Sequence, residues 1–196
     1  MKTHHCVGFI IDSDFKRVMA VREKRINKFT GKMRPLKSYL KAPGGTNRDI
    51  LDETALETLK RKILKETGIL VEKASLFLIE DVIDEHHSIY YYKILAWRNL
   101  KRSRRIYRTQ TLTKDISSFF VSLRVFSKNL LPTQRIAFVK LVLWFAERSQ
   151  EFLAKNKELV NRFRNEKELA EYLGEYYEYF NRKLSFLEKL KEFIKF

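Results

Sequence analysis

The sequence contains few of the residues that stabilise secreted proteins or form long linkers. Its 196 residues include one cysteine, three prolines and six glycines. The single Cys6 excludes an internal disulfide, and the scarcity of proline and glycine argues against long flexible segments. No apolar run approaches the ~20 residues of a membrane-spanning helix, and the N-terminal run is too short for a secretory signal. We therefore expect an intracellular, cytoplasmic protein without a membrane partner.

Acidic residues are also scarce, with 24 Asp and Glu against 40 Lys and Arg, so the net charge is +16. Residues 1–115 carry +11 of this charge and residues 116–196 carry +5. Such a surface attracts polyanions, above all nucleic acids. The alternative is a lysine-rich surface that only maintains solubility.

The order of apolar patterns predicts an α/β protein. A helix is expected at residues 54–67, where Gly68 ends it, and another from Pro132 to about residue 155. Residues 22–37 resemble a basic loop. We expect one domain at residues 1–155 and a helical extension at residues 156–196. Strands are expected at residues 6–11, 17–21, 72–83, 88–97, 107–112 and 119–126.

The last segment, residues 166–196, has the clearest periodicity in the chain. Leu173, Phe180, Leu187 and Ile194 recur every seven residues. A helix with so broad an apolar face must bury it against another surface. The preceding helix is one candidate surface, and a second copy of the chain or another protein is the alternative.

The most specific pattern lies at residues 44–69, which begin with Gly-Gly and end with Glu-Thr-Gly-Ile. This segment resembles the Nudix box, whose pattern is G-x5-E-x7-R-E-U-x-E-E-x-G-U, where U is an aliphatic residue. The loop that leads to the first glutamate is two residues longer here than in the pattern. The resemblance implies a Nudix-like α/β/α sandwich around a mixed sheet, with the box forming a loop, a helix and a second loop. The positions expected to brace the box are Gly45, Glu53, Arg61 and Gly68.

The metal-binding part of the box is altered. Nudix hydrolases cleave a nucleoside diphosphate linked to another moiety, and glutamates on one helix face hold a divalent cation, usually magnesium. The resemblance places Lys62, Lys65 and Glu66 at those positions. Because a protonated lysine has no lone pair to offer a metal, we expect no conventional metal site and no cofactor. Lys62 and Lys65 would instead contact phosphate groups, or simply extend into solvent.

The sequence is compatible with two alternatives. The first is an active pyrophosphohydrolase on nucleoside diphosphate derivatives or capped RNA, with Glu66 as a residual catalytic residue. Such an enzyme would hold Mg²⁺ or Mn²⁺ through rearranged ligands, with Glu66 and Glu57 as the first choices. Further carboxylates that could take part are Asp52, Glu80, Asp81, Asp84 and Glu85. The second alternative is a scaffold subunit that docks through residues 166–196.

A second basic feature lies at residues 98–108, which contain six basic residues and no acidic one. Arginines with an interleaved tyrosine suit phosphate contacts and base stacking. This run predicts binding of RNA or another phosphorylated polymer, and a solvated loop is the alternative. The residues are Arg98, Lys101, Arg102, Arg104, Arg105, Tyr107 and Arg108. The sequence thus favours a Nudix-like protein that binds a nucleotide or RNA phosphate without efficient hydrolysis.

Overall fold

The computed structural model describes residues 3–25, 39–81, 87–100, 106–110, 114–174 and 178. By its contacts the chain forms two compact units, Met1–Asn129 and Leu130–Phe196. This division lies earlier than the boundary expected after residue 155, because the helices that follow residue 134 pack on one another. No helix in the described parts of the chain is long and apolar enough to cross a membrane.

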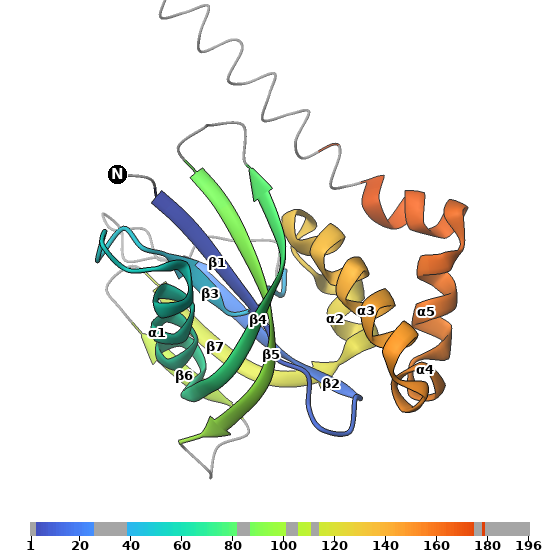
Figure 1. Ribbon diagram of the computed structural model, residues 1–196, viewed down its shortest axis with the longest axis horizontal. Coiled ribbons are helices and arrows are strands. Elements are labelled where there is room, and N and C mark those ends of the chain that lie inside the picture. Colours follow the sequence, from blue (N-terminus) through green and yellow to red (C-terminus); the bar gives the residue numbers. More distant parts are fainter. Residues whose placement is uncertain are drawn as a thin grey trace, which may run out of the picture. The chain divides into compact units, whose positions relative to one another are not determined.

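The first unit contains two sheets (Figure 1). Sheet A has the order β3-β1-β5-β4, where β1 runs parallel to β5 and the other pairs are antiparallel. Sheet B has the antiparallel order β2-β7-β6. The strands are β1 (Thr3–Phe9), β2 (Arg17–Arg25), β3 (Gly44–Thr46), β4 (Ile69–Asp81), β5 (His87–Asn99), β6 (Tyr107–Gln110) and β7 (Lys114–Ser122).

Two helices cover opposite faces of β1. Helix α1 (Ala55–Thr67) packs on the face that carries Cys6, Gly8 and Ile10. Helix α2 (Leu123–Asn129) lies on the other face, where its Phe126 ring is 6.5 Å from the ring of Phe9. Because neighbouring strand residues point to opposite faces, this arrangement is an α/β/α sandwich, as the sequence predicted.

Two expectations about elements were wrong. Residues 22–25 belong to β2 rather than to a loop, because they complete an antiparallel ladder with residues 114–117 of β7. Residues 123–126 belong to α2 rather than to a strand. The Ser122 hydroxyl accepts a hydrogen bond from the Val125 amide at 3.2 Å, which favours the start of a helix there.

Most described residues of the second unit are helical. A 3-10 turn (Pro132–Gln134) precedes α3 (Arg135–Arg148), α4 (Gln150–Lys155) and α5 (Lys157–Arg164). The expected helix from Pro132 to residue 155 is thus divided at Ser149, whose hydroxyl accepts from the Phe152 amide and caps α4.

The periodic C-terminal segment is described only at residues 166–174 and 178, which are helical. Tyr172 in this segment is buried, its ring lies 5.1 Å from that of Phe163, and its carbonyl accepts from the Arg135 guanidinium at 2.7 Å. The beginning of the apolar stripe therefore packs within its own unit. The expected docking role of the rest falls on residues outside the described ranges.

Candidate functional site

The box helix α1 begins and ends where its sequence predicts. Thr54 and Glu57 form a capping box, in which the Glu57 amide donates to the Thr54 hydroxyl and the Thr54 amide donates to the Glu57 carboxylate at 2.9 Å. The hydrogen bonds from Thr54 lower the pKa of Glu57. Gly68 ends the helix with φ of 70°. Glu57 thus caps the helix, which differs from the metal-ligand role considered for it.

The two glycines before the helix allow close approaches. A Cβ on Gly44 would lie 2.0 Å from the carbonyl oxygen of Cys6 on the neighbouring strand. A Cβ on Gly45 would lie 3.0 Å from the Cδ of Lys62, whose aliphatic stem therefore covers this glycine. Glycine is therefore required at position 44 for the approach of the box loop to β1, whereas a Cβ at position 45 would displace only the flexible stem of Lys62.

The loop between Gly45 and Glu53 is held by buried Asn47. Its carboxamide oxygen accepts from the His4 amide at 3.0 Å, and its nitrogen donates to the Leu51 carbonyl at 3.2 Å. The Asn47 amide donates in turn to the His4 carbonyl. The longer loop therefore has its own anchor on β1.

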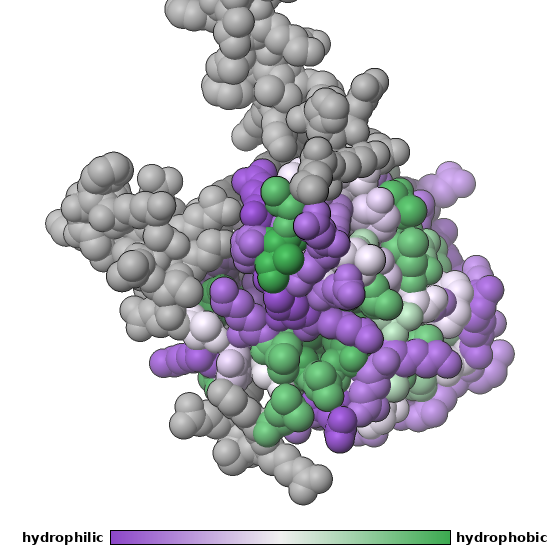
Figure 2. Space-filling view, turned by 60° about the vertical axis from the view of Figure 1, so that its left-hand side comes forward, coloured by the Kyte–Doolittle hydropathy of each residue, from purple (hydrophilic) through white to green (hydrophobic). Residues whose placement is uncertain are grey.

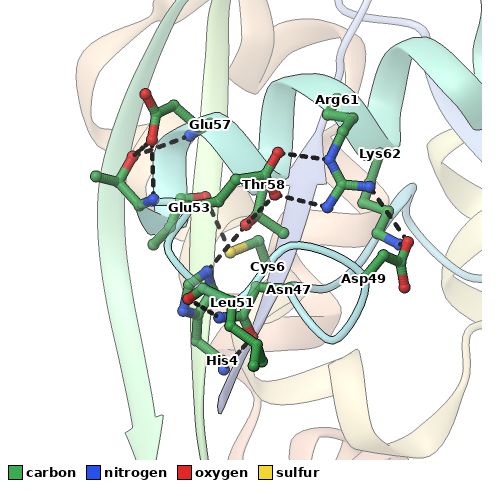
Figure 3. A network of polar contacts seen from close by, with 12 residues as sticks. His4, Cys6, Asn47, Asp49, Leu51, Glu53, Glu57, Thr58, Arg61 and Lys62 are labelled. Carbon is green, nitrogen blue, oxygen red and sulfur yellow. Dashed lines mark hydrogen bonds and ion pairs between the residues drawn. The ribbon is translucent and has the colours of Figure 1, made fainter. Parts of the chain in front are cut away.

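Arg61 and Glu53 join the loop to the helix (Figure 3). The guanidinium donates from Nε and Nη2 to the two carboxylate oxygens, both at 2.6 Å, which is a bidentate pair. The Thr58 hydroxyl donates to the same carboxylate at 3.0 Å and lies 3.0 Å from His4 Nε2. The hydrogen bonds from Arg61 are the main cause of a lowered pKa for Glu53. Arg61 and Glu53 thus have the geometry of a brace.

Lys62 forms an ion pair with the inserted loop. Its Nζ lies 2.6 Å from an Asp49 carboxylate oxygen, and Arg61 Nη1 lies 3.3 Å from the same atom. The Lys62 side chain is 14% exposed, whereas that of Asp49 is 52% exposed. Lys62, mainly through its hydrogen bond, lowers the pKa of Asp49. A carboxylate from the longer loop therefore neutralises the lysine that stands where the family has a glutamate.

Lys65, one turn further along α1, is exposed. Among the described residues no ion pair of its side chain is found, and its carbonyl accepts from the Thr109 hydroxyl at 3.2 Å. Lys62 and Lys65 therefore differ in environment, although the sequence assigned both the same role.

Glu66, the one retained carboxylate of the three, is buried and held by Lys41. Lys41 Nζ lies 3.2 Å from Glu66 Oε1 and 2.8 Å from Glu23 Oε2, so one ammonium bridges two carboxylates. The other oxygen of Glu66 accepts from the Gly44 amide at 3.0 Å. Burial opposes the charge of Lys41, but the charges of Glu66 and Glu23 and their hydrogen bonds outweigh it, and the pKa of Lys41 is raised.

The carboxylate oxygens of the box do not fit a divalent cation. Mg²⁺ needs several free oxygen ligands in octahedral geometry, but Lys41 and the Gly44 amide engage the Glu66 oxygens. Within the described ranges no group of three or more His, Cys, Asp or Glu side chains could hold a metal ion. Of the replacement carboxylates considered, Asp52 is exposed, Glu80 accepts from the Tyr91 hydroxyl at 3.0 Å, and the side chains of Asp81, Asp84 and Glu85 lie outside the described set.

The structure describes only part of the basic run at residues 98–108. Arg98 forms an exposed ion pair with Glu72 at 2.7 Å. Arg108 is exposed on β6 and Tyr107 is half-buried on the same strand. The expected nucleic-acid contacts of Lys101, Arg102, Arg104 and Arg105 fall on residues outside the described ranges.

Sequence reasoning missed six residues of this network: His4, Glu23, Lys41, Asn47, Asp49 and Thr58. The sequence held a signal for Asp49, because the loop before Glu53 is two residues longer than the pattern and carries carboxylates close to the lysines of the helix. Lys41 lies three residues before the first glycine of the box, but only the tertiary structure shows that it reaches Glu66. Cys6, buried below this network, donates to the Ala55 carbonyl, and burial raises its pKa to about 12, so it is a core residue.

The surface on this side of the first unit is mixed. Figure 2 shows a band of hydrophilic side chains between two apolar areas. The exposed apolar residues of the box loop and its helix are Ile50, Leu51, Leu56 and Leu64.

Comparisons with known proteins yield structural likenesses only. No family model and no curated protein matches the sequence. A MutT structure from work on Aliivibrio salmonicida and Vibrio cholerae is 17% identical, and the match covers 72% of this chain and 96% of MutT with a TM-score of 0.49. A putative Nudix hydrolase from Chromobacterium violaceum is 17% identical over 91% of this chain and 97% of its own, with a TM-score of 0.47. An ADP compounds hydrolase is 10% identical over 76% of each chain, with a TM-score of 0.49. The Nudix-like α/β fold that the sequence predicted is the fold described above, with its mixed sheet, box helix and C-terminal helices.

Proposed function

We propose that this chain is a Nudix-fold protein that binds a nucleotide or the phosphate of an RNA without efficient hydrolysis. The observation that carries this proposal is the bond between Lys41 Nζ and Glu66 at 3.2 Å. The ammonium occupies an oxygen that a divalent cation would need, and no described carboxylate replaces it. In this proposal the box keeps its fold, and its charged side chains pair with one another instead of binding a metal ion.

Two lysines support a binding role. Lys62 and Lys65 lie three residues apart on α1, so their side chains leave the same side of the helix. The partner of Lys62, Asp49, has a side chain that is 52% exposed, so water reaches the carboxylate and makes this pair weaker than a fully buried one. A phosphate can therefore displace Asp49 and take its place beside Lys62.

The hydrolysis part of the proposal is tested by product release. Nucleotide sugars, dinucleotides and capped RNA are incubated with Mg²⁺ or Mn²⁺, and release of phosphate or nucleoside monophosphate is measured. We expect no turnover above that of a Glu66→Gln variant. Turnover that Glu66→Gln abolishes would show an active hydrolase with rearranged ligands and would refute the proposal.

The binding part is tested with ADP and pyrophosphate by isothermal titration calorimetry. Lys62→Met should weaken binding, whereas Asp49→Asn should tighten it about two- to fivefold, because it removes the competing carboxylate. Lys60→Met, which removes an exposed lysine of the same helix, is the matched control. Equal affinities for all four proteins would contradict a phosphate site at Lys62.

A further inference from the structure

The register of sheet B places basic residues from distant parts of the chain on one face. Arg22 of β2 lies opposite Ser117 of β7, and Ser117 lies opposite Arg108 of β6. Directly opposed residues in antiparallel strands point to the same face. The two arginines therefore flank Ser117 in a row across three strands, about 10 Å apart at two strand spacings.

This face is the one turned away from the box helix. Met19, in the same strand as Arg22, packs in the core under α1, and Glu23 bonds Lys41 on that side. Strand residues alternate between faces, so Arg22 and Lys24 point the opposite way. Arg22, Lys24 and Arg108 are all exposed.

An aromatic ring lies within this basic group. The Arg22 guanidinium lies 5.5 Å from the centre of the Phe119 ring, within the range of a cation–π contact. Phe119 and Ser117 are half-buried. In the described register one carboxylate lies on this face, that of Asp115 opposite Lys24. The face therefore carries three basic side chains and one acidic side chain.

We propose that this face of sheet B, formed by Arg22, Lys24, Arg108, Ser117 and Phe119, binds single-stranded nucleic acid. Arginines at this spacing contact phosphates, and a guanidinium and an aromatic ring side by side suit the stacking of an unpaired base. The first unit carries +13 of the net charge of +16, which favours a polyanionic partner. The surface is distinct from the box, so the proposal does not depend on the function proposed for the box.

The test is fluorescence anisotropy of labelled oligouridylate of about 12 nucleotides, a length within the range of known single-strand sites. The double variant Arg22→Gln/Arg108→Gln should bind about tenfold more weakly, and the slope of log K against log salt should fall by about 1.4, or 0.7 for each lost phosphate contact. The matched control is Arg164→Gln/Lys167→Gln, which removes two exposed charges from the second unit. It should bind like the wild type. A DNA oligonucleotide of the same length distinguishes RNA from single-stranded DNA as the ligand.

A second pair of variants separates this surface from general charge effects. Ser117→Glu places a carboxylate between the two arginines, and Ser75→Glu places one on β4 of the other sheet. Only Ser117→Glu should weaken oligonucleotide binding, while ADP binding at the box should be the same in both. An equal loss of oligonucleotide affinity in Ser117→Glu and Ser75→Glu would overturn the proposal. Binding of the protein to anionic vesicles without binding to the oligonucleotide would also overturn it. Circular dichroism spectra and melting curves identify a variant that has lost its fold.

Discussion

Lys41 is the residue whose replacement tests the central geometric claim about the box. It bridges Glu66 and Glu23, and the side chains of these two residues are 9% and 13% exposed. Lys41→Met keeps most of the side-chain volume but leaves two nearly buried carboxylates without their cation. Breaking a buried ion pair costs about 3–5 kcal/mol. We expect a loss of about 3 kcal/mol, at the low end of that range, because the Lys41 side chain retains 21% exposure.

The assay is urea unfolding followed by tryptophan fluorescence. The chain has two tryptophans, and Trp144→Phe leaves Trp97, whose ring lies 5.7 Å from Phe120 in the first unit. With an m-value of about 2 kcal/mol/M, a loss of 3 kcal/mol lowers the midpoint by about 1.5 M urea. Lys60→Met is the control and should shift the free energy of unfolding by less than about 0.5 kcal/mol.

A double-mutant cycle shows whether the cost of Lys41→Met arises from the carboxylates. In a Glu66→Gln background only Glu23 is left without its cation, so Lys41→Met should cost at least about 1 kcal/mol less than in the wild type. Additive costs, or a Lys41→Met protein as stable as Lys60→Met, would refute the claim that Lys41 neutralises Glu66.

Three further predictions concern the loop and its glycines. Arg61→Lys cannot form the bidentate pair with Glu53 and should lower the urea midpoint by the equivalent of about 1–2 kcal/mol, and a wild-type midpoint would contradict the bracing role. The folded-state pKa of Glu53 lies below its ordinary 4.5, so its contribution to stability is present above about pH 4.5 and is lost as the pH falls through the folded pKa. The free energy of unfolding of Glu53→Gln should therefore fall less than that of the wild type between about pH 5 and 3. If the two free energies fall in parallel, the titration of Glu53 does not cause the loss. Gly44→Ala should destabilise the protein strongly because its Cβ would collide with the Cys6 carbonyl, whereas Gly174→Ala, with no atom within 4 Å of its Cβ, should leave the melting temperature unchanged or slightly higher.

The parts of the fold that depend on local pattern could be predicted from the sequence. The box helix was expected at residues 54–67 and lies at Ala55–Thr67, because Thr54 and Gly68 are strong local signals for its start and end. The strand at 119–126 was partly wrong, since an apolar run such as Phe119 to Phe126 fits either a strand or a short helix. In the structure the chain changes from β7 to α2 inside this run.

The ion pairs of the box could not be predicted in the same way. On a helix alone, Lys62 is four residues from Glu66 and would pair with it. The structure instead pairs Lys62 with Asp49, thirteen residues earlier, and Glu66 with Lys41, twenty-five residues earlier. Both partners come from the loops that approach α1, and their positions depend on the close packing that Gly44 and Gly45 allow.

These pairings change the interpretation of the basic charge. From the sequence alone, lysines in place of glutamates make the box positive. In the structure Asp49 faces Lys62, and Glu23 and Glu66 share Lys41, so the box is close to neutral over its described ion pairs. A small phosphate ligand must then compete with Asp49, which limits its affinity. On the outer face of sheet B the residue directly opposite both Arg22 and Arg108 is the uncharged Ser117, and the carboxylate of Asp115 lies opposite Lys24. The two sites should therefore respond independently: Asp49→Asn should tighten ADP binding and leave oligonucleotide binding unchanged, because removing a carboxylate from the box adds no phosphate contact on the opposite side of the sheet.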